Sequence, residues 1–354
     1  MGSSFVHLHN HTDASALDGA AKPLPLAERA IQLDMPAVAI TDHGTLSGLY
    51  DFYQACTKTG IKPILGLESY FMPIDYPRTH TEPIRIANGK DDDISGRGSY
   101  THVTMWAENN TGLQNLYAMS TGSYETGFYQ KPRIDIELLS QHSEGIIATT
   151  GCPSGEVQTL LRLGRYDEAR RVAGTFQDIL GRENYFLELM DHGLEVEARA
   201  REGLMRLAKD LNIPLVGTND LHYVYREDAT MHEAFLCVQS GSNMQNPNRF
   251  KFDGNAFYLR SAEEMREVFK ELPEACDNTL LIAERCNITI EPQDGLMPVY
   301  PTDSGRSSIQ EFSIAIRDGL SKRLGVPADE VPQEYKNRAL YEFEIIKQMN
   351  FPDY

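Results

Sequence analysis

The feature that most constrains the fold is an alternation, over the first two thirds of the chain, between short apolar runs rich in β-branched residues and longer amphipathic segments. This alternation is typical of β/α units. Several runs are apolar at nearly every position, as expected for parallel strands buried on both faces. We predict seven strands: Phe5–His9, Pro36–Ile40, Ile61–Glu68, Thr101–Trp106, Gly145–Thr150, Tyr185–Met190 and Pro214–Asn219.

Amphipathic helix patterns lie between these runs. From Tyr166 to Leu180 the apolar residues fall on one stripe, and Gly181 follows as a C-cap. A shorter stripe follows Pro25. Units of this kind predict an α/β fold, a distorted barrel related to the eight-fold (βα) type, although a doubly wound sheet would give a similar pattern.

The composition changes after Cys286. A linker rich in proline and glycine precedes two helical patterns, Ile309–Leu324 and Tyr335–Met349. We place a domain boundary near residue 285. The final residues carry no closing signal, and we therefore expect the chain to be a piece of a longer protein.

The chain is acidic: 33 Lys and Arg oppose 51 Asp and Glu, a formal charge of −18. This argues against a protein that coats duplex DNA by bulk electrostatics, but not against a nucleic-acid enzyme that recruits cations through carboxylates. The scattered cysteines fit a reducing compartment. No apolar run approaches the roughly 18 residues of a membrane span, and the start lacks a signal-peptide core. We expect a soluble, cytoplasmic protein with no membrane partner.

Metal-ligating residue types gather near the ends of the predicted strands. His7, His9 and His11 alternate, which places them on one face of an extended segment, where two imidazoles can chelate one cation. Asp18 follows in a turn, and His43 follows the second strand. The alternatives are a histidine-rich terminus, an ordinary turn aspartate and a helix cap with its neighbour.

Further candidates follow later strands. Glu68 ends the third strand, Cys152 follows the fifth, and Asp220 and His222 form a second chelating pair after the seventh. A buried apolar filler is the alternative interpretation of Cys152. His102 fits less well, because a parallel fourth strand would aim it at the wrong end of the barrel. Either that strand runs the other way or its predicted boundary is misplaced.

Without His7 the candidates are five histidines, two aspartates, one glutamate and one cysteine, and these nine ligands are too many for one ion and suit two or three. Such a cluster with Zn²⁺ or Mn²⁺ serves the hydrolysis of phosphate esters, because the ions activate water and clamp phosphate oxygens. The sequence contains no Walker loop, G-x-G-x-x-G motif or serine nucleophile elbow, so nucleotide-cradle and acyl-transfer chemistry compete poorly.

The order HLHNHT, LDG, TDHG, GLE, TH, GCPSGE and NDLH resembles the PHP (polymerase and histidinol phosphatase) family, and more narrowly the N-terminal regions of bacterial DNA polymerase III alpha subunits. KPRID at Lys131–Asp135 and NRFKFDG at Asn248–Gly254 support the resemblance, which covers essentially the whole chain. It implies a distorted (βα)7 TIM-like PHP barrel over residues 1–285. A linker and the helical start of the polymerase thumb and palm region would follow over 286–354. The chain would stop before the palm aspartates, so we expect no polymerase activity from it.

The resemblance also implies nine metal positions, which fall on His9, His11, Asp18, His43, Glu68, His102, Cys152, Asp220 and His222. A complete set implies a centre of two or three ions, Zn²⁺ or Mn²⁺, and 3′–5′ exonuclease proofreading at the 3′ end of a DNA primer. The implied partners are the remainder of the alpha subunit and other replisome subunits. We expect Asp220, Glu68 and His43 to be catalytic, with Glu68 bridging two ions.

Four cations are candidates for DNA phosphate contacts: Lys131, Arg133, Arg249 and Lys251. The alternative for each is a solvated or buried, paired cation. Two rival functions also stay open, a small-molecule phosphoesterase of the histidinol phosphatase type and a catalytically silent interaction platform in a replisome.

Overall fold

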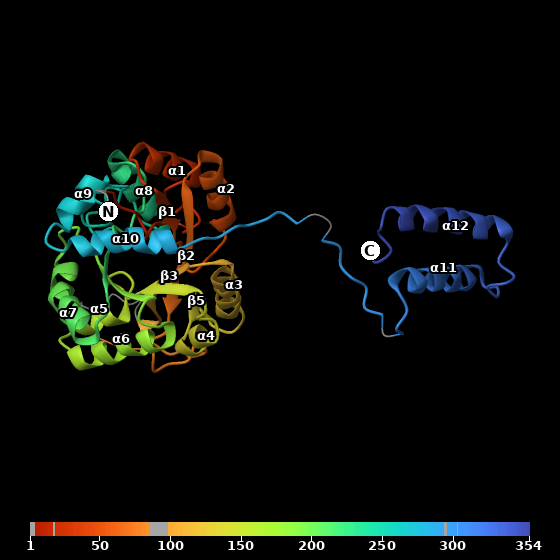
Figure 1. Ribbon diagram of the computed structural model, residues 1–354, viewed down its shortest axis with the longest axis horizontal. Coiled ribbons are helices and arrows are strands. Elements are labelled where there is room, and N and C mark those ends of the chain that lie inside the picture. The colour runs from red at the N-terminus through yellow and green to blue at the C-terminus, as the bar shows by residue number, and fades with distance from the viewer. Residues whose placement is uncertain (1–3, 17, 85, 87–97, 294–295, 303) are drawn as a thin grey trace. The chain divides into compact units, whose positions relative to one another are not determined.

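The computed structural model describes residues 4–16, 18–84, 86, 98–293, 296–302 and 304–354. The chain divides into two compact units, Met1–Thr289 and Ile290–Tyr354. The first unit is α/β, and the second contains the helices α11 (Ser308–Leu324) and α12 (Gln333–Gln348) (Figure 1).

The first unit is built on one curled sheet with the order β4-β5-β2-β3-β6-β7-β8, in which β1 also pairs with β2. Its strands are β1 (Ala37–Ile40), β2 (Lys62–Phe71), β3 (Thr101–Ala107), β4 (Phe128–Tyr129), β5 (Lys131–Ile134), β6 (Ile146–Thr149), β7 (Tyr185–Leu189) and β8 (Leu215–Gly217). Six of the seven predicted strands are confirmed, with shifted ends. The short β4–β5 hairpin was not predicted.

Strand β3 runs against its neighbours. It pairs antiparallel with both β2 and β6, whereas β6, β7 and β8 pair in parallel. The first residues of β3 therefore lie beside the last residues of β2, with His102 opposite Tyr70. This direction resolves the difficulty with His102, because the start of β3 lies at the same rim as the carboxyl ends of the parallel strands.

The prediction of a strand over Phe5–His9 is wrong, because this described segment has no strand ladder. Its hydrogen bonds are divided between two neighbours instead. The backbone N–H of Ala39 in β1 donates to the carbonyl of His7 (3.0 Å), and the N–H of Leu221, which follows β8, donates to the carbonyl of His9 (3.0 Å). The segment thus lies between β1 and β8 and closes the curled sheet. Together with the six confirmed strands, this segment accounts for the seven predicted members, and the prediction of a distorted (βα)7 TIM-like barrel is confirmed.

Among the described residues of the first unit, ten α-helices accompany the sheet: α1 (Pro23–Gln32), α2 (Leu49–Thr59), α3 (Asn110–Glu125), α4 (Ile136–Gln141), α5 (Glu156–Arg162), α6 (Tyr166–Leu180), α7 (Glu195–Leu211), α8 (Ala229–Ser240), α9 (Ala262–Val268) and α10 (Pro273–Arg285). The predicted helix over Tyr166–Leu180 is confirmed as α6, and the N–H of Gly181 closes it by donating to the carbonyl of Gln177. Among the described helices, none is both long and apolar enough to cross a membrane.

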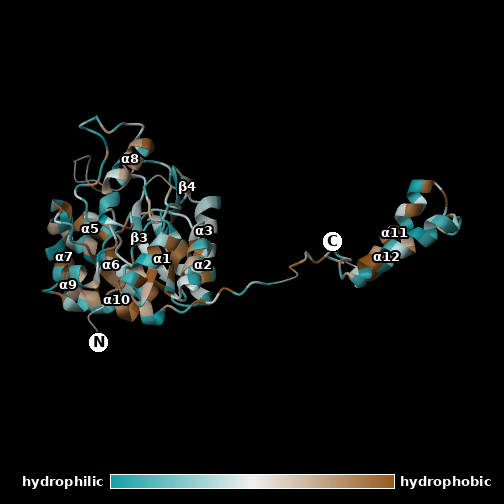
Figure 2. Ribbon diagram, turned by 90° about the horizontal axis from the view of Figure 1, so that it is seen from above, coloured by the Kyte–Doolittle hydropathy of each residue, from teal (hydrophilic) through white to brown (hydrophobic). Residues whose placement is uncertain are grey.

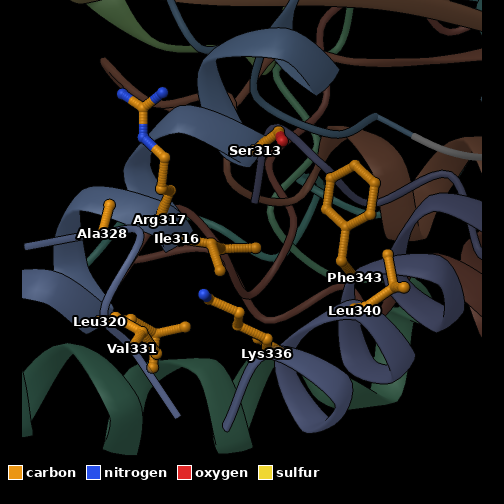
Figure 3. Close-up of a pocket in the computed structure, with 10 residues that line it drawn as sticks. Ser313, Ile316, Arg317, Leu320, Ala328, Val331, Lys336, Leu340 and Phe343 are labelled. Carbon is orange, nitrogen blue, oxygen red and sulfur yellow. The ribbon is translucent and has the colours of Figure 1, made fainter. Parts of the chain in front are cut away.

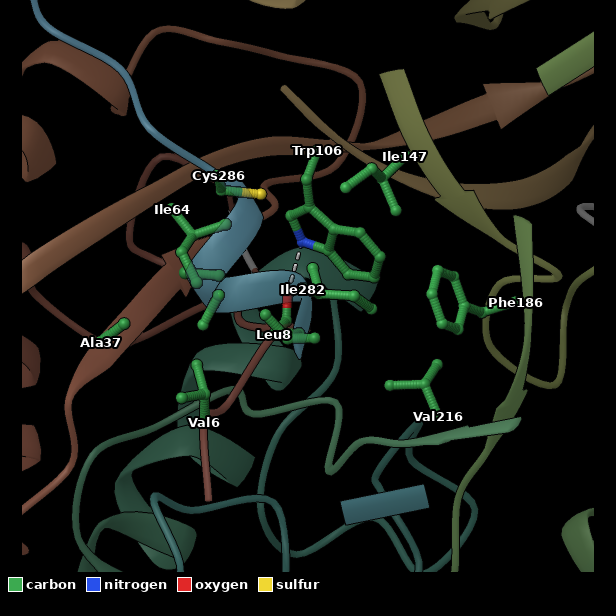
Figure 4. Packing of buried hydrophobic residues seen from close by; sticks show 12 residues of the cluster. Val6, Leu8, Ala37, Ile64, Trp106, Ile147, Phe186, Val216, Ile282 and Cys286 are labelled. Atoms are coloured by element: carbon green, nitrogen blue, oxygen red, sulfur yellow. Dashed lines mark hydrogen bonds between the residues drawn. The ribbon is translucent and has the colours of Figure 1, made fainter. Parts of the chain in front are cut away.

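An apolar core fills one end of the barrel (Figure 4). Trp106, at the end of β3, is fully buried there, and its indole N–H donates to the carbonyl of Leu8 (2.8 Å). Helix α10 contributes Ile282 and Ala283 to the same cluster. Figure 2 shows α10 and α8 at opposite ends of the unit. The rim formed by the carboxyl ends of the parallel strands is therefore left for polar side chains.

The second unit is a helix pair with its own small apolar interior. Ser307 caps α11 by accepting from the N–H of Gln310, and the rings of Phe312 and Phe343 lie 5.6 Å apart between α11 and α12. A cavity of about 360 Å³ opens between the helices, with Leu340 and Phe343 on its wall (Figure 3).

Candidate metal centre

The structure brings all nine predicted ligand residues into one continuous cluster at the polar rim. They come from the N-terminal segment, the turn after it, the ends of β1, β2, β6 and β8, and the start of β3. The side chains of the cluster are those of His9, His11, Asp18, His43, Glu68, His102, Cys152, Asp220 and His222.

Glu68 lies at the centre of the cluster and is almost completely buried. Its Oε2 is 2.7 Å from Nδ1 of His43, 3.2 Å from Nε2 of His11 and 3.4 Å from Nε2 of His9. Its Oε1 is 3.0 Å from Nδ1 of His102. One carboxylate thus faces four imidazoles, which is the position that a bridging ligand would need.

Asp220 faces the same two imidazoles of the N-terminal segment. Its Oδ1 is 3.1 Å from Nε2 of His11 and 3.5 Å from Nε2 of His9. The backbone of Asp220 has φ +42°, a conformation that aspartate and asparagine tolerate better than other residues with a side chain. The Nδ1–H of His222 donates to the carbonyl of Asp220 (2.8 Å), which leaves Nε2 of His222 for the cluster.

Asp18 and Cys152 lie at the edges of the cluster. The Oδ2 of Asp18 is 3.4 Å from Nε2 of His43, and the backbone carbonyl of Asp18 accepts from Nε2–H of His232 on α8 (2.6 Å). The Sγ of Cys152 is 3.4 Å from Nδ1 of His102. Cys152 is buried beside a candidate ligand, so its burial alone does not make it an apolar filler.

Two glycines allow the loops to approach their neighbours. Gly44 has φ +62°, and a Cβ there would lie 2.6 Å from the ring of Tyr70. Gly151 has φ +77°, and a Cβ there would lie 2.5 Å from the carbonyl oxygen of His102. The glycines in the loops that follow β1 and β6 are therefore required by close packing and by backbone conformation.

The donor set fits divalent cations. Three groups of three side chains have ligand atoms within 4.8 Å of one another: His9, His11 and Asp220; His11, His43 and His222; and His43, Glu68 and His102. Six buried atoms of the cluster lack a hydrogen-bond partner among the described residues: Nε2 of His9 and His11, Nδ1 of His43, Oε2 of Glu68, Oδ1 of Asp220 and Oδ1 of Asp18. Buried polar atoms are rarely left unpaired, and imidazole with carboxylate suits Zn²⁺ and Mn²⁺.

The charges of the cluster are strongly coupled. Burial disfavours the charged form of His11, but the carboxylates of Asp220 and Glu68 beside its Nε2 outweigh burial and raise the pKa of His11 to about 10. Burial opposes ionisation of both carboxyls, but the surrounding imidazoles hold the pKa of Asp220 and that of Glu68 well below the usual range. Burial lowers the pKa of His222 to about 3. A cation that binds here must therefore displace protons from imidazoles.

The sequence analysis assigned no role to several residues that lie behind the cluster. Glu188 in β7 accepts from Nδ1–H of His9 (2.7 Å). Asp42 accepts from the hydroxyl of Ser15 (2.8 Å), whose Oγ is 3.0 Å from Nδ1 of His11. For Glu188 the sequence did contain a signal, because this carboxylate interrupts an otherwise apolar run.

The structure separates the four candidate DNA contacts. Nζ of Lys131 lies 5.1 Å from the centre of the Tyr70 ring, beside the cluster. Arg133 is buried, and its guanidinium donates to three backbone carbonyls, so this geometry gives it a structural role in place of the predicted DNA contact. Arg249 is paired with a glutamate of α8 (2.7 Å), and Lys251 is exposed.

Comparison with known proteins gives one family. The model of the PHP domain matches residues 7–192, more than half of the chain. The DNA polymerase III subunit alpha of Mycobacterium tuberculosis (strain H37Rv) is 50% identical over 358 residues, covering 100% of this chain and 30% of that protein. The subunit alpha of Mycobacterium leprae is 48% identical over 357 residues, covering 99% and 30%. This chain thus spans about a third of the length of these relatives.

Among solved structures, an amidohydrolase from Chromobacterium violaceum, determined with bound sulfate and no metal, is similar at 14% identity with a TM-score of 0.38. The similarity covers 62% of this chain and 88% of that one.

Proposed function

Because the chain belongs to the PHP domain family, we propose that its first unit is a metal-dependent phosphoesterase that removes nucleotides from the 3′ end of a DNA strand. It would do so as the N-terminal part of a replicative DNA polymerase III alpha subunit in the cytoplasm. The observation that carries the proposal is the cluster of nine ligand-type side chains, six of whose buried nitrogen and oxygen atoms have no hydrogen-bond partner among the residues that the structure describes.

The residues of the cluster would hold two or three ions, Zn²⁺ or Mn²⁺. His9, His11 and Asp220 would hold one ion, and Glu68 would bridge two. The other ligands fall into two further sites: His102 and Cys152 help to hold one, and Asp18, His43 and His222 complete the other. When bound, such ions activate water and stabilise negative charge on phosphoryl oxygens.

The protein's own residues would organise the site around those ions. Glu68 fixes four imidazoles around one carboxylate, so that the ligands of neighbouring sites keep constant spacing. His43 faces both Glu68 and Asp18, and Asp220 faces the opposite pair of histidines. These contacts support catalytic roles for Asp220, Glu68 and His43.

Lys131 is the best-placed candidate among the four cations for a substrate phosphate. The ammonium group of Lys131 lies over the ring of Tyr70, and this ring stacks on the imidazole of His43 with 5.9 Å between the ring centres. Lys131 makes no ion pair among the described residues. A phosphate that binds near the cluster would be within reach of this charge. Lys251 and Arg249 would at most contact DNA farther along the strand.

The two rival functions are less well supported. A silent interaction platform would not need a complete and unsatisfied ligand set. A histidinol-phosphatase-type enzyme acts on a small molecule. The two DNA polymerase III alpha subunits, in contrast, share 48–50% sequence identity with this chain over 99–100% of its length. In the same way, we propose that residues 286–354 are the linker and helical start of the thumb and palm region. The partners would be the remaining alpha subunit, other replisome subunits and the primer 3′ end.

Elemental analysis and a digestion assay test the proposal together. The chain is purified without chelator, its metal content is measured, and a 5′-labelled primer with a mismatched 3′ end is incubated with Zn²⁺ or Mn²⁺. We expect two or three ions per chain and progressive shortening from the 3′ end, which Glu68→Gln abolishes. Binding of no metal would refute the centre. Bound metal with hydrolysis of small phosphomonoesters, but an intact primer, would favour the phosphatase alternative.

A further inference from the structure

Glu188 is a buried carboxylate one layer below the polar rim. It is the fourth of the five residues of β7, which lies between β6 and β8, and has 2% exposure. Three donors surround it: Oε1 accepts from Nδ1–H of His9 (2.7 Å) and from the hydroxyl of Thr218 (2.6 Å), and Oε2 accepts from the hydroxyl of Thr149 (2.5 Å). The carboxylate is therefore held by neighbouring strands on both sides and points at one imidazole.

The contact fixes which nitrogen of His9 faces the cluster. Because the hydroxyls of Thr218 and Thr149 also donate to this carboxyl group, its oxygens serve as acceptors, and Nδ1 of His9 carries the hydrogen of the contact. The lone pair of the ring is then on Nε2, which lies 3.4 Å from Oε2 of Glu68 and 3.5 Å from Oδ1 of Asp220. Ring orientation and tautomer are thus both set by a residue that does not face the candidate ions.

We propose that Glu188 is a positioning residue of the metal centre, which fixes the tautomer of His9 and increases the electron density that its Nε2 offers to a cation. This inference rests on the proposed metal centre. Carboxylates behind ligating histidines orient the ring and raise its basicity, and their loss commonly costs about 10–100-fold in metal affinity.

The chain contains a matched control. Glu197 forms the same kind of buried pair with Nδ1 of His192 (2.5 Å), but Nε2 of His192 is 3.0 Å from the carbonyl oxygen of Asn219. Both ring nitrogens of His192 are occupied, so this imidazole offers no lone pair to the cluster. Glu197→Gln removes a buried carboxylate–imidazole charge without touching a ligand.

Two substitutions of Glu188 separate charge from position. Glu188→Gln keeps the shape, since the amide oxygen can accept from His9 and Thr218 while the amide nitrogen donates to Thr149, but it removes the charge. Glu188→Asp keeps the charge but is one methylene shorter, so it withdraws the oxygen from Nδ1 of His9. Since the proposal requires both the position and the charge of the carboxylate, it predicts that neither substitution preserves metal affinity. If only the negative charge of Glu188 mattered, Glu188→Asp would preserve metal affinity.

The test is a Zn²⁺ titration of the full chain in competition with a chromophoric chelator, beside thermal melting of the metal-free proteins. We expect both Glu188 variants to raise the Kd of one bound ion about 10–100-fold. Glu197→Gln should bind as wild type, and the metal-free Glu188→Gln protein should melt close to wild type. Wild-type affinity in Glu188→Gln, with a lowered melting temperature, would overturn the inference and leave the metal centre intact. A wild-type chain that binds no Zn²⁺ would overturn both.

If Glu188→Gln does not fold, Thr218→Val decides the question, because it removes one of the two hydrogen bonds that hold Oε1 of Glu188 opposite Nδ1 of His9, while both residues of the pair stay in the chain. We expect a several-fold rise in Kd from this variant. An unchanged Kd in folded Thr218→Val would overturn the inference.

Discussion

Replacing Asp220 by asparagine should separate a ligand from a structural aspartate. Asparagine keeps the side-chain volume and tolerates the backbone angle of +42°, so the fold should be retained. The substitution removes the only anionic side chain from the group that Asp220 forms with His9 and His11. Metal affinity should fall at least 10–100-fold, since changes behind the ligands alone cost about that much. At a fixed concentration of free Zn²⁺ the lost stabilisation is about 1.4–2.7 kcal/mol.

Three measurements on Asp220→Asn carry the argument: the Kd for Zn²⁺, the digestion of a labelled primer from its 3′ end, and melting with and without chelator. We expect a raised Kd, no digestion, and a melting temperature that differs from wild type only when metal is present. An aspartate that merely caps the following turn would instead lower stability by about 1 kcal/mol without metal and leave digestion unchanged. That pattern would refute the assignment.

Removing the metal from the wild-type chain with a chelator should lower its stability, because an ion whose free concentration is 100 times its Kd stabilises the fold by about 2.7 kcal/mol. Calorimetry with and without EDTA measures this difference, and equal melting curves would contradict it. Burial raises the pKa of Glu156 to about 8, above its ordinary 4.5, so its contribution to stability is complete below pH 4.5 and is lost as the pH rises through 8. Between pH 5 and 8, the free energy of unfolding of Glu156→Gln, measured in urea, should rise relative to that of wild type by up to about 1.4 kcal/mol per pH unit. If the two free energies of unfolding change in parallel with pH, the raised pKa is disproved. Gly44→Ala should lower the free energy of unfolding, measured in urea, by at least about 1–2 kcal/mol, because the backbone at this position is left-handed and the new Cβ would clash with Tyr70. An unchanged free energy of unfolding would show that the loop relaxes.

Much of the sheet was predictable, because β-branched apolar runs are found where strands are buried on both faces. The direction of β3 was not, since a strand covered on both faces has the same composition whether it is parallel or antiparallel. Residues 5–9 resemble a strand in sequence and occupy the place of one. They lack a ladder because their backbone groups are shared between β1 and Leu221.

The candidate ligands could be predicted from the sequence, whereas the roles of the buried charged residues Glu188 and Arg133 could not. His9, Glu68 and Asp220 follow or end apolar runs, where polar side chains stand out in a sequence. Glu188 and Arg133 show the limit of that signal, because both roles are set by partners on other strands. A buried charge within a strand indicates that a partner exists, but not which residue provides it.

The closure of the barrel by the N-terminal segment has a consequence for synthesis on the ribosome. His9 and His11 are translated long before their backbone partner Leu221, which emerges roughly 200 residues later, about 10–40 s at ordinary elongation rates of about 5–20 residues per second. During that interval the nascent chain carries these two histidines without the neighbours that bury them. An ion site that includes Asp220 cannot assemble before that point, so metal loading would have to follow the emergence of β8 from the exit tunnel.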